Sequence, residues 1–173
     1  MDGMWLVVTI ITGLFTANQA DIKPKCEKST TGWKKYRGYE YKMICPSKWM
    51  SFQEAELQCN EYAAHLVSIH GPRENSFVHN LVGPQRNMIL YSWIGLHRHH
   101  VGGEWKWTDG SDVDYLHWAY GQPDNYNGVP GFTPENCAQM YIVQGAHWDK
   151  QWNDVKCTRE VDYFVCKRKA NWR

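Results

Sequence analysis

The first half of the chain contains two segments in which apolar residues recur every three or four positions. In residues 51–63 this spacing runs from Phe52 to Cys59 and predicts an amphipathic helix with Cys59 on its buried face. Ser51 and Glu54 have the spacing of a capping box, in which the two side chains satisfy backbone N–H groups at the start of a helix. The helix is therefore expected to begin at Ser51.

A second helix is predicted from Pro72 to about Val82. Proline suits the first position of a helix because the N–H that it lacks would be unpaired there, and Gly83 followed by Pro84 is a stop signal. The side chains expected to face the core are those of Phe77, Val78 and Leu81.

The rest of the pattern predicts strands joined by loops. Short apolar or alternating runs typical of strands cover residues 65–69, 89–96, 104–108, 138–143 and 163–167. The stretch over residues 109–136 is crowded with glycine, proline, asparagine and aspartate, and so long a loop in a compact domain usually carries function. Two helices followed by strands and a long loop indicate an α+β fold.

Composition narrows the class of protein. The chain has 173 residues, 43% of them apolar and 14% aromatic, so it can form the core of one domain and is not disordered. Its 19 basic and 18 acidic residues leave a formal net charge of +1, which argues against a nucleic-acid partner. Among its ten tryptophans, those expected to lie chiefly in the core are Trp93, Trp105, Trp107, Trp118 and Trp152.

The N-terminal segment has the pattern of a secretory signal peptide. Residues 4–15 form an apolar run that is too short to span a bilayer, and small and polar residues follow it up to Ala20. We therefore expect residues 1–20 to be a signal peptide and the mature protein to be secreted and extracellular, with no membrane span. The alternatives are a buried N-terminal strand or a short anchor.

The cysteines agree with an oxidising compartment. All six follow residue 20, and none belongs to a Cys-x-x-Cys pair, which argues against structural zinc and against a thioredoxin-type site. Six cysteines outside the cell most simply form three disulfides, although their number alone leaves the pairing open. They are Cys26, Cys45, Cys59, Cys137, Cys157 and Cys166.

The long loop supplies side-chain oxygens of the kind that a hard cation requires. Calcium takes about six to eight oxygen ligands from carboxylates, carboxamides and carbonyls. Gln122, Asp124 and Glu135 belong to the loop, and a later turn supplies Asn153 and Asp154. This set could hold calcium and leave one or two positions for an outside ligand. On composition alone, however, polar loop residues are more often simply solvated.

Five short sequence motifs in a fixed order favour the calcium site over simple solvation of these loop residues. They are Trp93-Ile-Gly-Leu96, Trp107-Thr-Asp-Gly110, Gln122-Pro-Asp124, Glu135-Asn-Cys137 and Trp152-Asn-Asp154. With the cysteine spacing, these strings resemble the C-type lectin family over about residues 26–168. The resemblance implies an α+β double-loop fold with two helices, antiparallel strands and a long irregular calcium-binding loop. It places a long-form C-type lectin domain at residues 21–168 and a basic C-terminal tail at residues 169–173.

The resemblance also implies the disulfide pairing. In this family a bridge ties the first helix to the last strand, which corresponds to Cys59–Cys166, and a second bridge secures the binding loops, which corresponds to Cys137–Cys157. In the long form an N-terminal pair closes a hairpin, which corresponds to Cys26–Cys45. This last pair departs from the family pattern because its spacing is wider and Pro46 follows where an aromatic residue is common.

A single calcium ion and a sugar are implied as ligands. The family's principal calcium is held by residues that match Gln122, Asp124, Glu135, Asn153 and Asp154. Two vicinal sugar hydroxyls complete its shell, and the sugar-binding positions are Gln122, Asp124, Tyr126, Glu135 and Asn153. The Gln-Pro-Asp order resembles galactose-type members, whereas Glu-Pro-Asn marks mannose-type ones. The peptide bond before Pro123 is expected to be cis, and Tyr126 is expected either to stack on the sugar or to pack within its loop.

Other charged and titratable groups are expected to play smaller roles. An auxiliary calcium is not expected, because Arg98, Asn125 and Asn136 stand where other members carry acids. His97, His99 and His100 are interpreted as part of an exposed loop, with a zinc site or a pH sensor as the alternative. The basic residues at the C-terminal end are interpreted as a solvated tail, with a heparin site as the alternative; they are Lys167, Arg168, Lys169 and Arg173.

The resulting prediction is a secreted calcium-dependent lectin for terminal galactose or N-acetylgalactosamine on glycoproteins or glycolipids. The chain contains no motif of a nucleophilic or metalloprotease active site, so it is not expected to be an enzyme. Two alternatives are mannose-type specificity and a domain that binds a protein and reuses the calcium site. No segment before Cys26 has the pattern of a coiled-coil neck, so an oligomer would have to form through the domain surface.

Overall fold

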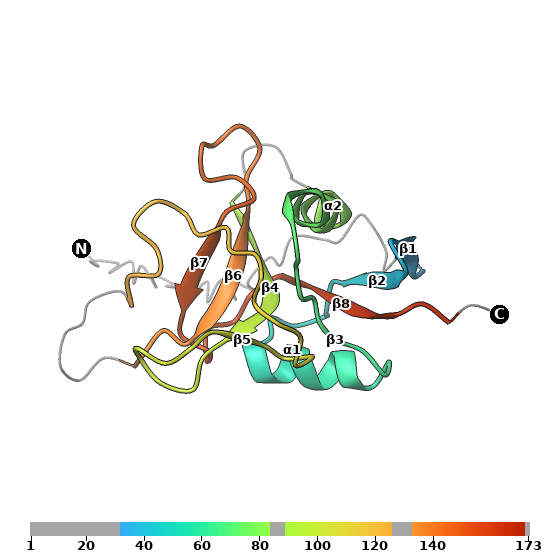
Figure 1. Ribbon diagram of the computed structural model, residues 1–173, viewed down its shortest axis with the longest axis horizontal. Coiled ribbons are helices and arrows are strands. Elements are labelled where there is room, and N and C mark those ends of the chain that lie inside the picture. The colour runs from blue at the N-terminus through green and yellow to red at the C-terminus, as the bar shows by residue number, and fades with distance from the viewer. Residues whose placement is uncertain (1–31, 84–88, 126–132, 172–173) are drawn as a thin grey trace, which may run out of the picture.

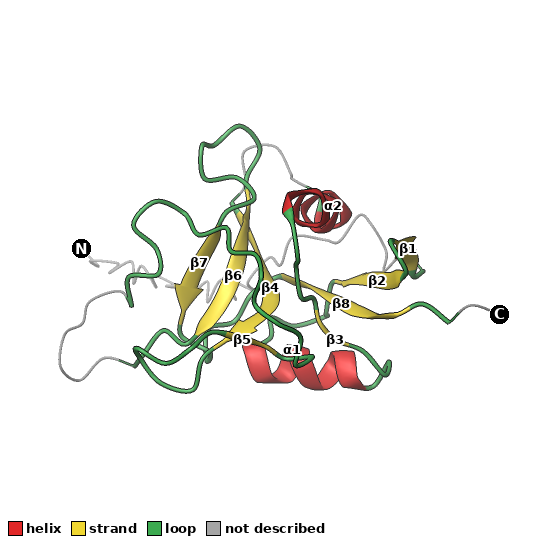
Figure 2. Ribbon diagram, viewed as in Figure 1, coloured by secondary structure: helices red, strands yellow, loops and turns green. Residues whose placement is uncertain are grey.

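The protein folds as two helices packed against an eight-stranded sheet (Figures 1 and 2). The computed structural model describes residues 32–83, 89–125 and 133–171. The strands are β1 (Lys34–Tyr36), β2 (Tyr39–Ile44), β3 (His65–Leu66), β4 (Leu90–His97), β5 (Lys106–Trp107), β6 (Cys137–Ile142), β7 (Trp152–Val155) and β8 (Tyr163–Lys169). The helices are α1 (Phe52–Asn60) and α2 (Pro72–Val82). This architecture confirms the α+β prediction.

The last strand lies at the centre of the sheet. The strand order is β1-β2-β8-β4-β6-β7, with β3 paired to β8 and β5 paired to β4. All pairs are antiparallel except β4 with β8. Because every residue of β2 pairs with β8, the C-terminal strand joins the N-terminal hairpin to the sheet. The two strands that carry the candidate loops, β6 and β7, form the opposite edge (Figure 1).

Helix α1 begins as its capping box predicts. The Ser51 side chain accepts from the Glu54 backbone N–H, and the Ser51 backbone N–H donates to the Glu54 carboxylate at 2.9 Å. The Ser51 backbone N–H and hydroxyl both donate to the Glu54 carboxylate and, with the nearby Lys48, lower the pKa of that carboxyl to about 2. The helix ends at Asn60, three residues before the predicted end, because the chain turns there with Ala63 at φ 50°.

Helix α2 has the predicted limits, but its buried face includes positions that were not predicted. Val78 is buried as expected, whereas Phe77 and Leu81 are only half-buried at the edge of the core. The other fully covered positions are Asn75, His79 and Val82, two of which are polar. Among the described residues, no helix is long and apolar enough to cross a membrane.

The two helices lie on opposite faces of the sheet. Alternate residues of β8 belong to two core clusters: Tyr163 and Val165 pack with α2, and Phe164 and Cys166 pack with α1. Trp93, Trp107 and Trp152 are at most 2% exposed, and Trp105 and Trp118 pack half-buried against the core. The tryptophans are therefore core residues, as predicted.

Two of the three expected disulfides lie in the described part of the chain. Cys59–Cys166 joins α1 to β8 across 107 residues, and Cys137–Cys157 joins the start of β6 to the segment after β7 across 20 residues. By loop entropy these closures are worth about 4–5 and about 3 kcal/mol of unfolding free energy. Cys45 is itself disulfide-bonded, but Cys26 lies outside the described residues, so the Cys26–Cys45 pair stays a prediction.

Several sequence-based boundaries change in the structure. The prediction missed β1 and β2, and β3 ends at Leu66 although the expected strand ran to Ile69. The interpretation of Lys167 and Arg168 as part of a solvated tail is wrong, since both belong to β8, which extends to Lys169. The expected signal peptide at residues 1–20 lies outside the described residues.

The two buried polar residues of α2 hold the segment that leads into β7. Asn75 Nδ2 donates to the Lys150 carbonyl at 3.0 Å, and its Oδ1 accepts from the Trp152 indole N–H at 2.9 Å. His79 Nε2 pairs with Asp149 at 2.8 Å, and Asp149 also accepts from the Val143 backbone N–H. Since buried polar groups need partners, α2 fixes this segment at the entrance to β7.

Replacing Asn75 by alanine should lower the free energy of unfolding by about 3 kcal/mol, because it leaves the buried Trp152 indole N–H and the partly buried Lys150 carbonyl without this partner. Urea denaturation followed by far-ultraviolet circular dichroism measures the change. The matched control is Ser76→Ala on the same helix, which should change the stability by less than about 0.5 kcal/mol. Equal stability of the two variants would contradict the role assigned to Asn75.

Candidate functional site

Three carboxylates from separate segments converge at the β7 edge of the sheet. Asp124 lies near the end of the described part of one loop, Glu135 precedes β6, and Asp154 lies within β7. One carboxylate oxygen from each lies within 4.8 Å of the other two, and this is the one such group of acidic, histidine or cysteine side chains in the described ranges. Three like charges so close repel one another unless cations or N–H groups compensate them.

The residues of the Trp-Asn-Asp string lie in strand β7. The prediction from the sequence that they form a turn is wrong. β7 pairs with β6 through the Ala138↔Asp154 and Gln139↔Asn153 registers. This pairing fixes the backbone beneath both side chains, and the Asp154 residue has no exposed surface. The sheet therefore provides a rigid base for one wall of the site, while loops provide the others.

Asp154 holds the loop that carries Asp124. Its two carboxylate oxygens accept from the backbone N–H groups of Asp124, at 3.1 Å, and of Asn125, at 2.9 Å. The Asn125 side chain then accepts from the Glu135 backbone N–H at 2.9 Å. This chain of hydrogen bonds connects all three acidic positions, so they are brought together by the fold even before any ion is considered.

The two predicted amide ligands are hydrogen-bonded to the backbone of the acidic residues. The Asp124 backbone N–H donates to Gln122 Oε1 at 3.3 Å, and Asn153 Nδ2 donates to the Asp154 carbonyl at 2.6 Å. The Gln122–Pro123 peptide bond is cis, as expected. Tyr126, the predicted stacking residue, lies outside the described residues. Four of the five proposed metal ligands are thus linked by hydrogen bonds to another member of the set or to its backbone.

An arginine lies against the inner side of the carboxylates. Arg98 Nη2 is 3.6 Å from an Asp154 carboxylate oxygen and donates to the Glu135 carbonyl at 2.9 Å, while its Nε donates to Asn136 Oδ1 at 3.1 Å. The guanidinium carbon is 4.7 Å from the centre of the Trp105 ring, and the side chain is only 8% exposed. The sequence analysis noted that Arg98 lacks the charge to bind a second ion, but it did not identify this contact with the site.

Burial dominates the electrostatics of Asp154. Desolvation raises the pKa of its carboxyl above the ordinary value, and the neighbouring Asp124 charge acts in the same direction. The N–H groups of Asn125 and Asp124 and the Arg98 guanidinium oppose this rise and reduce it. A divalent cation among the three carboxylates would favour the ionised form much more strongly than these neighbours do.

The donor set fits a hard divalent cation. Every side-chain donor that the site offers is an oxygen, from three carboxylates and two amides, which is the ligand type that calcium prefers. No histidine or cysteine in the described ranges joins the acidic group, so the donors do not suit zinc or copper. The side chains present at the site are therefore of the kind that calcium requires.

The histidines after Trp93 do not converge. His97 is the last residue of β4 and is partly buried against Phe52. The prediction that it belongs to an exposed loop is therefore wrong. His99 and His100 are exposed, as expected. Although the His97 and His99 rings are 5.9 Å apart, they do not form a metal-binding group with a third side chain of the described ranges.

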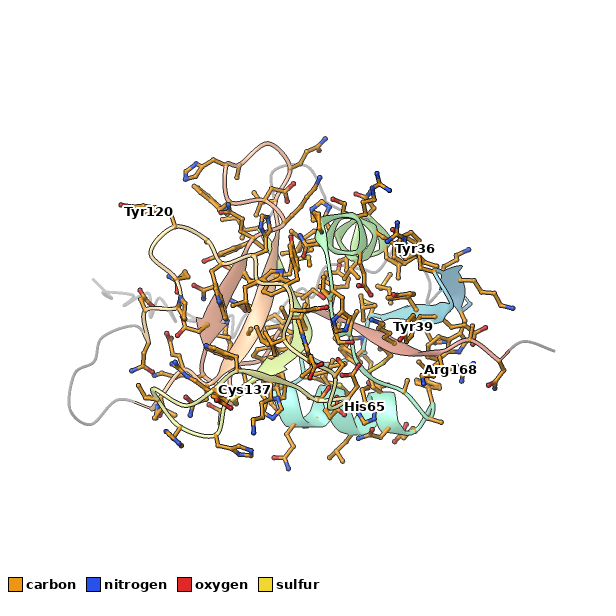
Figure 3. All side chains as sticks on the ribbon, viewed as in Figure 1. Tyr36, Tyr39, His65, Tyr120, Cys137 and Arg168 are labelled. Carbon is orange, nitrogen blue, oxygen red and sulfur yellow. A yellow bond between two sulfur atoms is a disulfide. The ribbon has the colours of Figure 1, made fainter. Side chains whose placement is uncertain are left out.

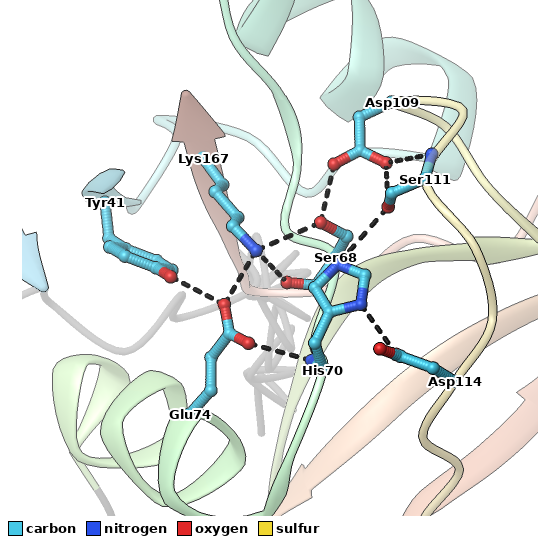
Figure 4. A network of polar contacts seen from close by, with 8 residues as sticks. All are labelled: Tyr41, Ser68, His70, Glu74, Asp109, Ser111, Asp114 and Lys167. Carbon is cyan, nitrogen blue, oxygen red and sulfur yellow. Dashed lines mark hydrogen bonds and ion pairs between the residues drawn. The ribbon is translucent and has the colours of Figure 1, made fainter. Parts of the chain in front are cut away.

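The basic C-terminal strand takes part in a structural network at the other end of the domain (Figure 4). Lys167 Nζ donates to Glu74 at 2.7 Å and to the Ser68 carbonyl at 2.9 Å, and Tyr41 donates to the same Glu74 oxygen. Arg168 is held by Glu40 and lies over the Trp33 ring. Both cations are neutralised within the fold, which removes the basis for a heparin site at these two residues.

The family model of the lectin C-type domain matches residues 48–168. The C-type lectin lectoxin-Lio1 of Erythrolamprus poecilogyrus is 34% identical over 146 residues, which cover 83% of this chain and 80% of that protein.

Two solved structures show how widely the fold is shared. The carbohydrate-recognition domain of the mouse scavenger receptor C-type lectin is 30% identical, with a TM-score of 0.62, and the match covers 82% of this chain and 96% of that one. A calcium-independent type II antifreeze protein is 26% identical, with a TM-score of 0.64, and the match covers 84% of this chain and 99% of that one. On the extent of the family match and the identity to its relatives, this chain belongs to the C-type lectin domain family.

Proposed function

We propose that the protein is a secreted, calcium-dependent lectin that binds terminal galactose or N-acetylgalactosamine. The observation that carries the proposal is the convergence of Asp124, Glu135 and Asp154 within 4.8 Å in a chain of the C-type lectin family. Three carboxylates bring a charge of −3 to an ion of +2, and the amides of Gln122 and Asn153 add neutral oxygens. The proposal is one of binding, with no chemical step.

Different residues of the site would accept hydrogen bonds from the sugar and donate hydrogen bonds to it. Bound calcium would supply a Lewis acid to which two vicinal sugar hydroxyls coordinate, which makes each hydroxyl a better hydrogen-bond donor. The carboxylates of Asp124 and Glu135 can accept from those hydroxyls, while the amide groups of Gln122 and Asn153 can donate to them. Because the site binds through an ordered set of donors and acceptors, that order selects which hydroxyl pair fits.

Galactose is the preferred sugar in this proposal because of the order of amide and acid. Gln122 precedes the cis peptide and Asp124 follows it, and the reverse order of acid and amide is the mannose-type arrangement. An aromatic face for the apolar side of galactose would come from Tyr126, a contact worth about 0.5–1.5 kcal/mol. The alternatives are mannose-type specificity and a domain that binds a protein partner and reuses the calcium site. One structural relative is described as a calcium-independent antifreeze protein, so a sugar ligand does not follow from the fold alone.

The protein should be retained on immobilised galactose in the presence of calcium and released by a chelator. Asp124→Asn and Glu135→Gln should each abolish retention because they remove charge from the acidic group, whereas the exposed matched control Asp112→Asn should bind normally. If the protein binds calcium but is retained on no sugar column, the protein-binding alternative is favoured.

The double variant Gln122→Glu with Asp124→Asn should move retention from galactose to mannose. It keeps the same number of carboxylates and amides but exchanges the sides on which the site donates and accepts. Affinity columns of the two sugars, run in calcium, measure the change. If the unaltered protein binds mannose more tightly than galactose, the sugar assignment is wrong, although calcium-dependent binding would remain.

Acidification should weaken calcium binding. In the absence of calcium it should also remove the buried negative charge of Asp154, which destabilises the folded protein. The raised pKa of Asp154 means that the folded protein holds this proton more tightly than the unfolded chain does. As the pH falls through that pKa, protons displace calcium, while the cost of the buried charge in the calcium-free protein disappears. The difference in Tm with calcium and with chelator should therefore shrink between pH 7.5 and pH 4.5, and an unchanged difference would contradict this account.

Removing Arg98 should make the protein more dependent on calcium. Arg98→Ala leaves the buried Asp154 charge without its guanidinium partner, so the calcium-free protein should lose about 3 kcal/mol of unfolding free energy. The stabilisation gained on adding calcium should increase, since the ion then replaces the missing positive charge. Chemical denaturation with calcium and with chelator measures both quantities.

Arg98→Lys is the informative companion, because it keeps the charge but cannot form the forked contacts with Glu135 and Asn136. It should fall between the unaltered protein and Arg98→Ala. The exposed Lys106→Ala serves as the matched control for loss of one positive charge and should leave both quantities unchanged. Equal calcium-free stability of Arg98→Ala and the control would contradict the role of Arg98.

A further inference from the structure

A cavity of about 550 Å³ lies at the end of the domain that carries the N-terminal hairpin. Its walls come from the β1–β2 hairpin, from the start of α2 and from β8. Tyr36 and Tyr39 line it and lie at the opposite end of the domain from Tyr120, which precedes the cis peptide (Figure 3). None of the described lining residues belongs to the candidate calcium site. The volume falls within the roughly 300 to 1,000 Å³ of small-molecule pockets.

The inner wall of the cavity is an ion pair whose charges cancel within the fold (Figure 4). The Lys167 side chain is 3% exposed and donates to Glu74 at 2.7 Å, and the Tyr41 hydroxyl donates to the same oxygen at 2.6 Å. The other Glu74 oxygen accepts from the His70 backbone N–H at 2.8 Å. Because these groups already hold one another, the inner wall gives a ligand an ordered surface without net charge.

Two arginines give the cavity its charge. Arg37 lies in the turn between β1 and β2, and Arg73 lies in the first turn of α2. Both are exposed, and neither forms an ion pair with a residue of the ranges 32–83, 89–125 and 133–171. Since Glu74 cancels Lys167, the two arginines leave the described lining with an excess of positive charge. A concave surface of one sign attracts ligands of the opposite charge.

A stack of aromatic rings connects the two elements that carry these arginines. The Arg37 guanidinium carbon is 5.7 Å from the centre of the Tyr36 ring. Tyr36 in turn stacks on Phe77 of α2, with 4.4 Å between the ring centres. The hairpin and the helix are therefore packed together, so the backbone positions of Arg37 and Arg73 are fixed relative to each other. Less order must then be imposed when one ligand contacts both.

The lining groups suit an anion and not a second cation. Lys167 Nζ already lies over the Tyr39 ring, 4.4 Å from its centre, and both oxygens of Glu74 already accept hydrogen bonds. The guanidinium groups at the rim can only donate, while phenol hydroxyls can donate or accept. A sulfate or phosphate ester has three terminal oxygens and can accept from two guanidinium groups at once. A carboxylate has two oxygens, which a single guanidinium satisfies.

We propose that this cavity binds a sulfate or phosphate ester carried on a hydroxyl-bearing ring. The ester oxygens accept from Arg37 and Arg73, and the ring hydroxyls hydrogen-bond to the phenol groups of Tyr36 and Tyr39. A folded protein partner would need a larger surface, of about 800 Å² on each side. Since the cavity is separate from the acidic group at Asp154, its occupation requires no calcium and does not depend on the proposed function.

The test is isothermal titration calorimetry in chelator at low salt. The probes are glucose 6-sulfate, glucose 6-phosphate, glucuronic acid, glucose and inorganic sulfate, and the chelator keeps calcium-dependent sugar binding out of the measurement. At least one ester should bind roughly tenfold more tightly than glucose or glucuronic acid, and its affinity should fall as salt is added. The ester that binds more tightly shows whether the natural ligand carries sulfate or phosphate.

Arg37→Gln and Arg73→Gln should each weaken ester binding roughly five- to tenfold, because each removes a charged donor and keeps most of the side-chain stem. The double variant should bind the esters no better than glucose. Arg37→Lys and Arg73→Lys should fall in between, since they keep the charge but lose the forked donor. The exposed Lys106→Gln, outside the cavity, is the matched control for loss of one charge and should bind normally. Because both arginines are exposed, all variants should keep the Tm of the unaltered protein.

Nuclear magnetic resonance places the ligand independently of the variants. The backbone amide signals of Gly71, Arg73 and Glu74 should shift when the tighter ester is added, whereas those of Asn153 and Asp154 should not. The site is disproved if no ester binds in chelator, if the double variant binds the ester normally, or if glucuronic acid or inorganic sulfate binds as tightly as the esters. Retention on galactose in calcium is a separate measurement, so failure of either proposal leaves the other standing.

Discussion

The structure of the site depends on one buried carboxylate. Asp154 has no exposed surface, so its charge must be compensated within the protein. Two backbone N–H groups from the loop at Asp124 and Asn125 provide part of that compensation, and the Arg98 guanidinium provides another part. Because these partners come from two segments far from β7 in the sequence, satisfying Asp154 also brings the two other acidic residues into reach. This compensation is incomplete, since burial still raises the pKa of the Asp154 carboxyl above its ordinary value.

The rest of the fold serves to hold that carboxylate in place. β7 presents Asp154 from the edge of the sheet, and α2 fixes the segment before β7 through Asn75 and His79. The Cys137–Cys157 bridge closes the other end of the β6–β7 unit. Farther away, the Cys59–Cys166 bridge and the Lys167–Glu74 pair secure the central strand β8. The loops can therefore vary in conformation or sequence while their attachment points stay fixed.

How far the sequence predicts this protein differs between its parts. The capping box at Ser51 and the proline at position 72 set the starts of both helices, since such signals act within one turn and need no distant partner. The buried face of α2 was predicted only in part: Asn75 and His79 were missed, because they are covered through partners about 70 residues away. The strand β7 was mistaken for a turn for a similar reason, since its four residues are ordered by pairing with β6.

The sequence by itself determined the helices, the apolar core and the set of oxygen-bearing side chains, because each of these depends on residue type and on spacing between neighbouring residues in the chain. Tertiary structure alone decided that Asp124, Glu135 and Asp154 share one position, that Arg98 faces them, and that Arg37 and Arg73 line one cavity. The physical reason is that burial and convergence depend on segments far apart along the chain. Their proximity is set by sheet pairing and disulfides, which no local pattern records.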